Sequence, residues 1–145
     1  MSSILTRTLA RLLLLPTLVV ALATLVKGYS QTGDGFSAGV IAATAILLQY
    51  LAFGRRAVRH LLPPFLAPAA VLGGLLLALL SAFVPTLFGQ AVLTHAPPPG
   101  AAVVSLGTLE VHTAVLFDVG VFSLVFGFVV GVLDRLAAVA EAPRE

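Results

Sequence analysis

Apolar residues gather in four long stretches along the chain, separated by charged residues, prolines and glycines. The stretches cover residues 9–26, 36–53, 65–88 and 114–133. A helix needs about 20 mostly apolar residues to cross a hydrocarbon core of about 30 Å, and a lone strand cannot satisfy its backbone in lipid. The pattern therefore predicts an all-α integral membrane protein in which residues 1–145 form a single membrane domain with four transmembrane helices.

Composition fits a membrane setting better than a soluble one. Hydrophobic residues make up 59% of the chain and charged residues 10%, and the mean hydropathy is +1.11. Soluble domains carry roughly 45–50% apolar and about 25% charged residues. The chain has no cysteine, and its three histidines are scattered, so we expect no metal site and no cofactor. Basic residues stand at the ends of the apolar runs, which is typical of membrane topology and argues against nucleic acid as a partner.

The distribution of these basic residues predicts the orientation of the chain. With the N-terminus inside, the outer side holds only Lys27, and the cytoplasmic side holds seven arginines. These are Arg7, Arg11, Arg55, Arg56, Arg59, Arg135 and Arg144. Such an excess predicts that both termini are cytoplasmic. The cluster at 55–60 could also bind a nucleotide or a phosphoinositide, but a topology signal in contact with anionic lipid is the favoured interpretation.

The first apolar stretch has a second interpretation. Arg7 and Arg11, the apolar run and the Ala21–Ala23 segment resemble a secretory signal with its cleavage site. Against cleavage, the apolar run continues past this segment through Leu25 and Val26. We therefore expect a retained transmembrane helix.

Small residues recur at four-residue spacing in the last three stretches, with one three-residue step in the last. Helices in lipid associate through close backbone approach, which such stripes allow. The stripes could pack against one another or against partner chains. The candidate packing residues are Gly35, Gly39, Ala43, Gly74, Gly120, Gly127 and Gly131.

Few polar groups lie at membrane depth. Asp118 is a candidate for an ion path, because an acid within a membrane is costly and is a functional hypothesis by default. It could equally be a structural anion, within reach of the positive N-terminal end of its own helix or paired with another protein chain. Gln49 is expected to make an interhelical hydrogen bond. In the outer loop, residues 89–113, His95 and His112 could sense pH, but solvated histidines are the favoured interpretation. Either a short hairpin or a flap against a partner is compatible with the length of this loop.

No nucleophile–base pair, Walker loop, dinucleotide fingerprint or metal-ligand spacing is present, so we expect neither catalytic nor metal-binding residues. Nor does one intramembrane acid make a complete transport path. Three classes stay open: a component of a larger transporter, a small self-contained homo-oligomeric transporter, and a membrane assembly or anchoring protein.

Two motifs stand at the starts of predicted helices, GDGFSAGVIAA at residues 33–43 and LFDVGVF at residues 116–122. They resemble the MnhB/MrpB family, the B subunit of the multisubunit (Mrp-type) Na+/H+ antiporter. Residues 33–43 are similar to the glycine-rich start of that family's second helix, and residues 116–122 to the start of its last. Residues 6–13, TRTLARLL, are similar too. The chain departs from the family pattern at residues 31–34 and 37–38, and its outer loop is longer than is typical.

The resemblance implies a non-catalytic membrane subunit of a Na+/H+ antiporter complex in a prokaryotic cell membrane. Its partners would be other antiporter subunits and the lipid bilayer, with Na+ and H+ moved by the complex. A B-like component of a complex-I-like or membrane-bound hydrogenase assembly is the related alternative. The resemblance assigns no transport role to Asp118 or Gln49.

Overall fold

The computed structural model describes residues 3–27, 33–96, 105–106, 109–110 and 113–142. It contains four helices and one pair of two-residue strands. The helices are α1 (Ile4–Lys27), α2 (Asp34–Leu61), α3 (Leu66–Leu87) and α4 (Thr113–Glu141), and the strands β1 (Ser105–Leu106) and β2 (Leu109–Glu110) pair antiparallel. The connection between α3 and α4 therefore contains a short hairpin. Its residues 97–104, 107–108 and 111–112, His112 among them, lie outside the described residues.

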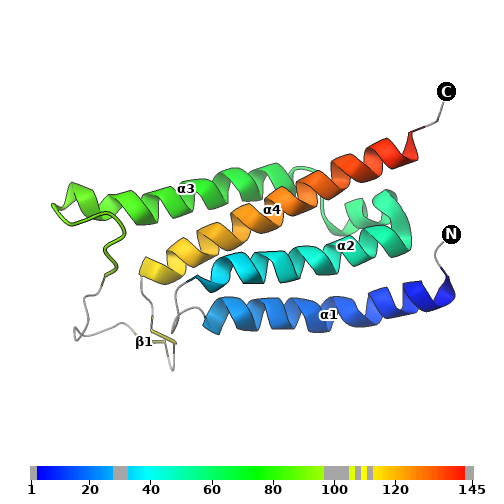
Figure 1. Ribbon diagram of the computed structural model, residues 1–145, viewed down its shortest axis with the longest axis horizontal. Coiled ribbons are helices and arrows are strands. Elements are labelled where there is room, and N and C mark those ends of the chain that lie inside the picture. The colour runs from blue at the N-terminus through cyan, green and yellow to red at the C-terminus, as the bar shows by residue number, and fades with distance from the viewer. Residues whose placement is uncertain (1–2, 28–32, 97–104, 107–108, 111–112, 143–145) are drawn as a thin grey trace.

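All four helices are long and apolar enough to cross a membrane. The shortest, α3, has 22 residues, which at 1.5 Å per residue is about 33 Å. The prediction of four transmembrane helices is confirmed. The helices lie nearly side by side along one long axis, with the start of α1 and the end of α4 at the same end (Figure 1).

Three helix ends lie outside the apolar stretches that predicted them. The structure begins α1 at Ile4 rather than residue 9, ends α2 at Leu61 rather than 53, and ends α4 at Glu141 rather than 133. All three extensions lie at the end that carries most of the arginines. Apolar runs mark only the hydrocarbon depth, whereas a helix can continue with its charged side chains in the head-group region.

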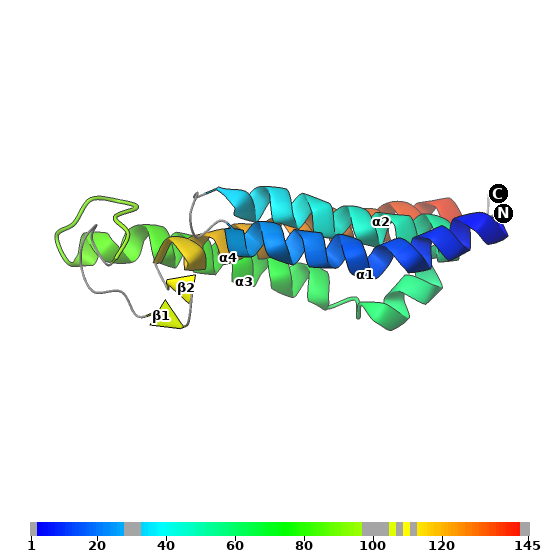
Figure 2. The same cartoon turned by 90° about the horizontal axis from the view of Figure 1, so that it is seen from below.

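A backbone break divides α2 at Gly54. This residue has φ 79° and ψ 173°, which is not helical and which glycine adopts at least cost. After the break, residues 55–61 form a short helical segment that turns away from the axis of α2 toward the start of α3 (Figure 2). The second apolar stretch, which ends at residue 53, therefore stops next to the helix break at Gly54. A further helical segment follows this break.

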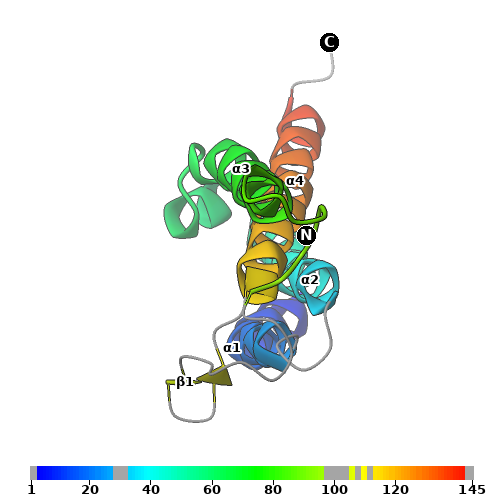
Figure 3. The same cartoon turned by 90° about the vertical axis from the view of Figure 1, so that its left-hand side faces the viewer.

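Viewed from one end, the helices form a row in the order α1, α2, α4, α3 (Figure 3). Helices α2 and α4 are central, and α1 and α3 flank them. Buried positions are mostly alanines and glycines, and Val58 is the largest fully buried side chain among the described residues. Close backbone approach, rather than a core of large side chains, joins these helices, as is typical in lipid.

Helix α1 is continuous across the segment that resembled a signal cleavage site. Its Ala10 and Ala21 are both buried in the structure, and it packs along α2. These contacts support α1 as an integral part of the folded bundle.

Candidate functional site

The glycines of α2 contact α4. A Cβ built on Gly35 would collide with the backbone carbonyl oxygen of Asp118, and one on Gly39 would lie 3.0 Å from the Val125 side chain. Ala43, one step further along the same face, is also buried. Any larger side chain at Gly35 would push α4 away, because a helix backbone cannot move aside as a side chain does.

The α3–α4 contact is equally close. A Cβ on Gly74 would lie 2.5 Å from the backbone nitrogen of Leu124 and 2.6 Å from the carbonyl oxygen of Gly120. A Cβ on Gly120 would lie 2.7 Å from the backbone nitrogen of Ala78, and one on Gly127 would lie 2.7 Å from the carbonyl oxygen of Ala67. Gly74 and Gly120 thus face each other, so the stripes of α3 and α4 interlock.

These contacts bear on the two uses left open for the small-residue stripes. Gly35, Gly39, Gly74, Gly120 and Gly127 all meet residues of their own chain. Gly131 is looser, since a Cβ there would make only an ordinary contact of 3.6 Å with Ala67. Gly35 and Gly39 therefore pack within the bundle, against α4.

Asp118 lies near the beginning of α4, with only 3% of its surface exposed. Its Oδ2 accepts a long hydrogen bond of 3.4 Å from the backbone N–H of Gly33, which precedes α2. The sequence had suggested the N-terminus of its own helix as the stabilising positive end, but the carboxylate faces the N-terminus of α2 instead. A helix start favours an anion there, so this geometry can hold a negative charge.

A cavity of about 240 Å³ adjoins this carboxylate. Its other lining residues are Gly33, Leu93, His95, Ala114 and Phe117. His95 Nδ1 lies 3.5 Å from the hydroxyl of Thr113. The fold thus places the carboxylate of Asp118 and the imidazole of His95, which are 23 positions apart in the sequence, beside the same cavity. A space of this size beside polar groups can hold water.

A second polar cluster lies at the opposite end of α4. Arg55 and Arg59 each donate two hydrogen bonds to Asp134, at 2.9 to 3.1 Å. Tyr50 adds a weaker hydroxyl contact to the same carboxylate, at 3.4 Å. Two guanidinium groups on one carboxylate tie the broken end of α2 to α4.

The break at Gly54 makes part of this cluster possible. It leaves the backbone N–H of Arg55 without a helical acceptor, and this N–H donates to Glu141 Oε1 at 3.2 Å. Sequence reasoning treated these arginines as a topology signal and missed their acidic partners. The sequence did contain a signal for this pairing, because Asp134 carries the opposite charge. With four spans, the end of the fourth helix lies on the same side of the membrane as the end of the second, which carries Arg55.

A buried polar contact joins helix α1 to α2. The side chain of Gln49 donates a 2.7 Å hydrogen bond from Nε2 to the backbone carbonyl of Ala10. The expectation of an interhelical hydrogen bond is confirmed. At the same end, the guanidinium of Arg11 lies 5.0 Å from the ring centroid of Phe53, within the range of a cation–π contact.

Within the described part of the chain, no three His, Asp or Glu side chains gather as metal ligands. The two buried or half-buried acids of α4, Asp118 and Asp134, lie in two separate polar sites.

Helices of this length and apolarity make the chain a multi-pass α-helical membrane protein, with its few buried polar groups near the two ends of the bundle. Comparison with known sequences identifies it more closely. The chain belongs to the MnhB family, described as "Domain related to MnhB subunit of Na+/H+ antiporter", which it matches over residues 5–131.

Individual relatives agree with this family. The chain is 35% identical to the B subunit of the Na(+)/H(+) antiporter of Bacillus subtilis over 111 residues, 76% of each chain. It is 29% identical to the same antiporter component of Alkalihalophilus pseudofirmus over 136 residues, 94% of this chain and 93% of that one. A probable combined A/B subunit of a K(+)/H(+) antiporter from Rhizobium meliloti is 37% identical over 121 residues, which are 81% of this chain and 12% of that protein.

Proposed function

We propose that this chain is the B subunit of a multisubunit cation/proton antiporter, in which it assembles with larger antiporter subunits. The observation that carries the proposal is the family match over residues 5–131. Full-length similarity to the B subunit of a Na(+)/H(+) antiporter supports it. This relationship favours the antiporter over a hydrogenase-type assembly and over a self-contained homo-oligomeric transporter.

The partners are the other subunits of the antiporter. The relative named as a combined A/B subunit matches this chain in only 12% of its length, which supports the A subunit as a neighbour. The transported ions are H+ and a monovalent cation. Sodium is favoured, since two of the three relatives carry Na(+) in their names and one carries K(+).

The protein lies in the cell membrane with both ends in the cytoplasm. Six of the seven arginines assigned to the cytoplasm belong to described residues, at the ends of α1, α2 and α4 that meet through the contacts of Arg11 and Arg55. Lys27 ends α1 at the other side. The excess of arginine at one end supports this orientation.

Asp118 contributes to the ion path of the assembled complex. Its burial, its long hydrogen bond from the backbone N–H of Gly33 and the adjoining cavity with His95 support this role. A carboxylate with spare acceptor capacity can take up a proton or a cation. The helix packing residues named above hold α4, and hence Asp118, in position.

The proposal is tested by coexpressing a tagged copy of this chain with the other antiporter genes of its source and purifying it in mild detergent. We expect the larger subunits to copurify, and vesicles containing the complex to exchange protons for Na+ or K+. Vesicles containing the single chain should show no exchange. Robust exchange by the single chain would contradict the proposal and favour the homo-oligomeric transporter. Copurification with hydrogenase subunits would favour the related alternative.

A further inference from the structure

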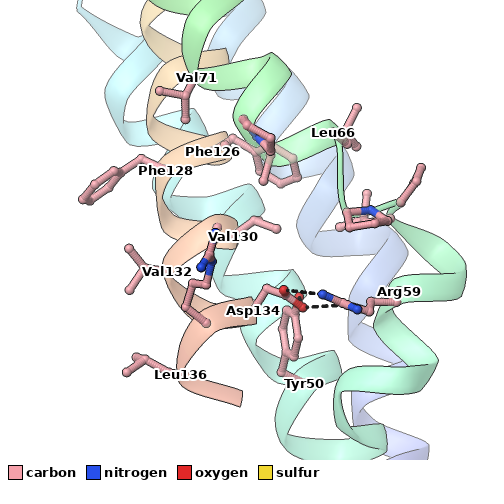
Figure 4. A pocket seen from close by; sticks show the side chains of 18 of the residues that line it. Tyr50, Arg59, Leu66, Val71, Phe126, Phe128, Val130, Val132, Asp134 and Leu136 are labelled. Atoms are coloured by element: carbon pink, nitrogen blue, oxygen red, sulfur yellow. Dashed lines mark hydrogen bonds and ion pairs between the residues drawn. The ribbon is translucent and has the colours of Figure 1, made fainter. Parts of the chain in front are cut away.

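An open groove lies beside α4 on the side of the bundle where α2 breaks. Its volume is about 880 Å³. The walls come from the end of α2, the connection from Leu62 to Pro64 with the start of α3, and the last turns of α4 (Figure 4). On α4 the lining runs from Phe126 to Ala138, which corresponds to roughly 18 Å of helix. The groove is thus long, narrow and open along its length.

Most of the lining is apolar, and several of its side chains are well exposed. Leu72, Phe128 and Leu136 are 67%, 62% and 61% exposed. The polar lining residues gather toward the end of α4, where Asp134 and Arg59 face each other (Figure 4). A site that is apolar along most of its length and polar at one end matches an amphiphile.

The charge of the polar end is positive. Three arginines, Arg55, Arg59 and Arg135, line the groove beside one acid, Asp134. The side chain of Arg59 remains 40% exposed while it contacts Asp134. Arg135 makes no ion pair within the described part of the chain. Three arginines and one acid give the lining residues a net charge of +2, which suits a phosphate group.

Two of the small residues that a partner helix would need are already in contact within the bundle. Gly127 and Ala67 both line the groove, but they contact each other at the α3–α4 crossing. The exposed lining instead presents bulky side chains such as Leu72 and Phe128. Close helix packing requires small residues at the contact, whereas flexible acyl chains conform to a bulky surface.

From this geometry we propose that the groove binds one anionic phospholipid. The phosphate lies against Arg59 and Arg135, and an acyl chain follows the apolar wall along Phe126 and Val71. Basic pockets between transmembrane helices are established sites for anionic head groups. The volume lies within the range of roughly 300–1,000 Å³ typical of ligand sites.

The test uses the intact complex in vesicles that contain a trace of phospholipid with a photoreactive acyl chain. One preparation carries a phosphatidylglycerol probe and the other a phosphatidylcholine probe with the same chains. After illumination, the crosslinked residues of this chain are mapped by peptide mass spectrometry. We expect the phosphatidylglycerol probe to label groove residues such as Phe128 and Leu136 several times more than the phosphatidylcholine probe.

Substitutions at the charged end test the head-group contacts. Arg135→Gln should lower groove labelling by phosphatidylglycerol about fivefold, the effect typical of one basic residue at an anionic surface. Arg59→Gln should act in the same direction. Arg56→Gln is the matched control, because Arg56 neighbours Arg55 but does not line the groove. Arg135→Gln removes none of the contacts to Asp134. We therefore expect this variant to fold normally even if Arg59→Gln disturbs folding.

A second pair of variants tests the apolar part. Gly131→Leu places a side chain in the groove where a Cβ meets only an ordinary contact, and it should lower labelling by either probe. Gly73→Leu, at a glycine with nothing within 4 Å of its Cβ and outside the groove, should leave labelling unchanged. Equal labelling by the two head groups would overturn the proposal. So would a photoreactive residue at Phe128 that crosslinks to another protein of the complex instead of lipid.

Discussion

Arg55 of α2 and Asp134 of α4 form an ion pair with two contacts, Nε to Oδ1 at 2.9 Å and Nη2 to Oδ2 at 3.0 Å. Arg59 makes the same pair of contacts with the same carboxylate. Because Gly54 breaks the helix just before them, both arginines reach Asp134 from a segment that has left the axis of α2. One carboxylate thus holds the broken end of α2 against α4.

Replacing Asp134 by asparagine should loosen this end of the bundle. The side chain keeps its shape but loses the charge that two guanidinium groups share, so their mutual repulsion is no longer offset. We expect the midpoint of thermal unfolding of the purified complex in detergent to fall by several degrees. Arg56→Gln removes a nearby charge outside the Asp134 cluster and serves as the control. Equal midpoints for the two variants would show that the cluster does not stabilise the fold.

Two adjacent glycines of α3 should respond oppositely to alanine. Gly74→Ala places a Cβ within 2.5 Å of the α4 backbone, whereas Gly73→Ala meets nothing within 4 Å. Both changes raise helix propensity by up to about 1 kcal/mol. Gly74→Ala should therefore destabilise by about 1–3 kcal/mol through overpacking, and Gly73→Ala should be neutral or stabilising. The measurement is unfolding in mixed micelles, and similar effects at both sites would contradict the proposed packing.

Loss of the Gln49 side-chain hydrogen bond should weaken the attachment of α1. Gln49→Leu removes the 2.7 Å contact with Ala10, and interhelical hydrogen bonds of this kind contribute about 0.6 kcal/mol on average. Thr44→Val is the matched control, because the Thr44 hydroxyl bonds within its own helix, to Val40. We expect faster proteolysis at the N-terminal end of α1, where this contact lies, for Gln49→Leu alone. Equal cleavage rates would remove this role from Gln49.

Asp118→Asn separates a role in ion movement from a structural one. Asparagine can still accept the hydrogen bond from Gly33 but cannot exchange a proton at neutral pH. If Asp118 serves the ion path, the complex should assemble normally and the exchange rate in vesicles should fall about tenfold, equivalent to about 1.4 kcal/mol in the barrier. Asp34→Asn removes an acid at the same end that does not line the cavity and should keep full exchange. Full exchange by Asp118→Asn would leave only the structural role.

Orientation is tested by single cysteines, which stand on a background free of cysteine. Cysteine at Ser3, His60 or Ala140 should be protected in intact cells from a membrane-impermeant maleimide, and cysteine at Ala91 should react. All four positions are exposed in the structure, so protection reports the membrane side rather than burial. Labelling of the His60 position from outside would reverse the proposed topology.

Much of the fold follows from the sequence one segment at a time. The number of spans could be predicted because the thickness of the bilayer and the need to satisfy backbone hydrogen bonds act on each apolar stretch by itself. The hydrogen-bonding role of Gln49 could be predicted for the same local reason, since an amide at membrane depth needs a partner. Its partner, the carbonyl of Ala10, could not, because any neighbouring helix offers carbonyl oxygens.

Tertiary structure decided which surfaces meet. Small-residue stripes on α2, α3 and α4 have no preferred partner in the sequence, because a glycine permits close approach by any backbone. The row α1, α2, α4, α3 assigns Gly35 and Gly39 to α4, and Gly74 to the opposite side of that same helix. Likewise, the break at Gly54 and the shared ion pair of Asp134 could be found only in the folded chain, since a lone glycine is compatible with a continuous helix. The periodicity of apolar residues determined the elements, whereas contacts between residues distant in the chain determined the two polar sites and the groove.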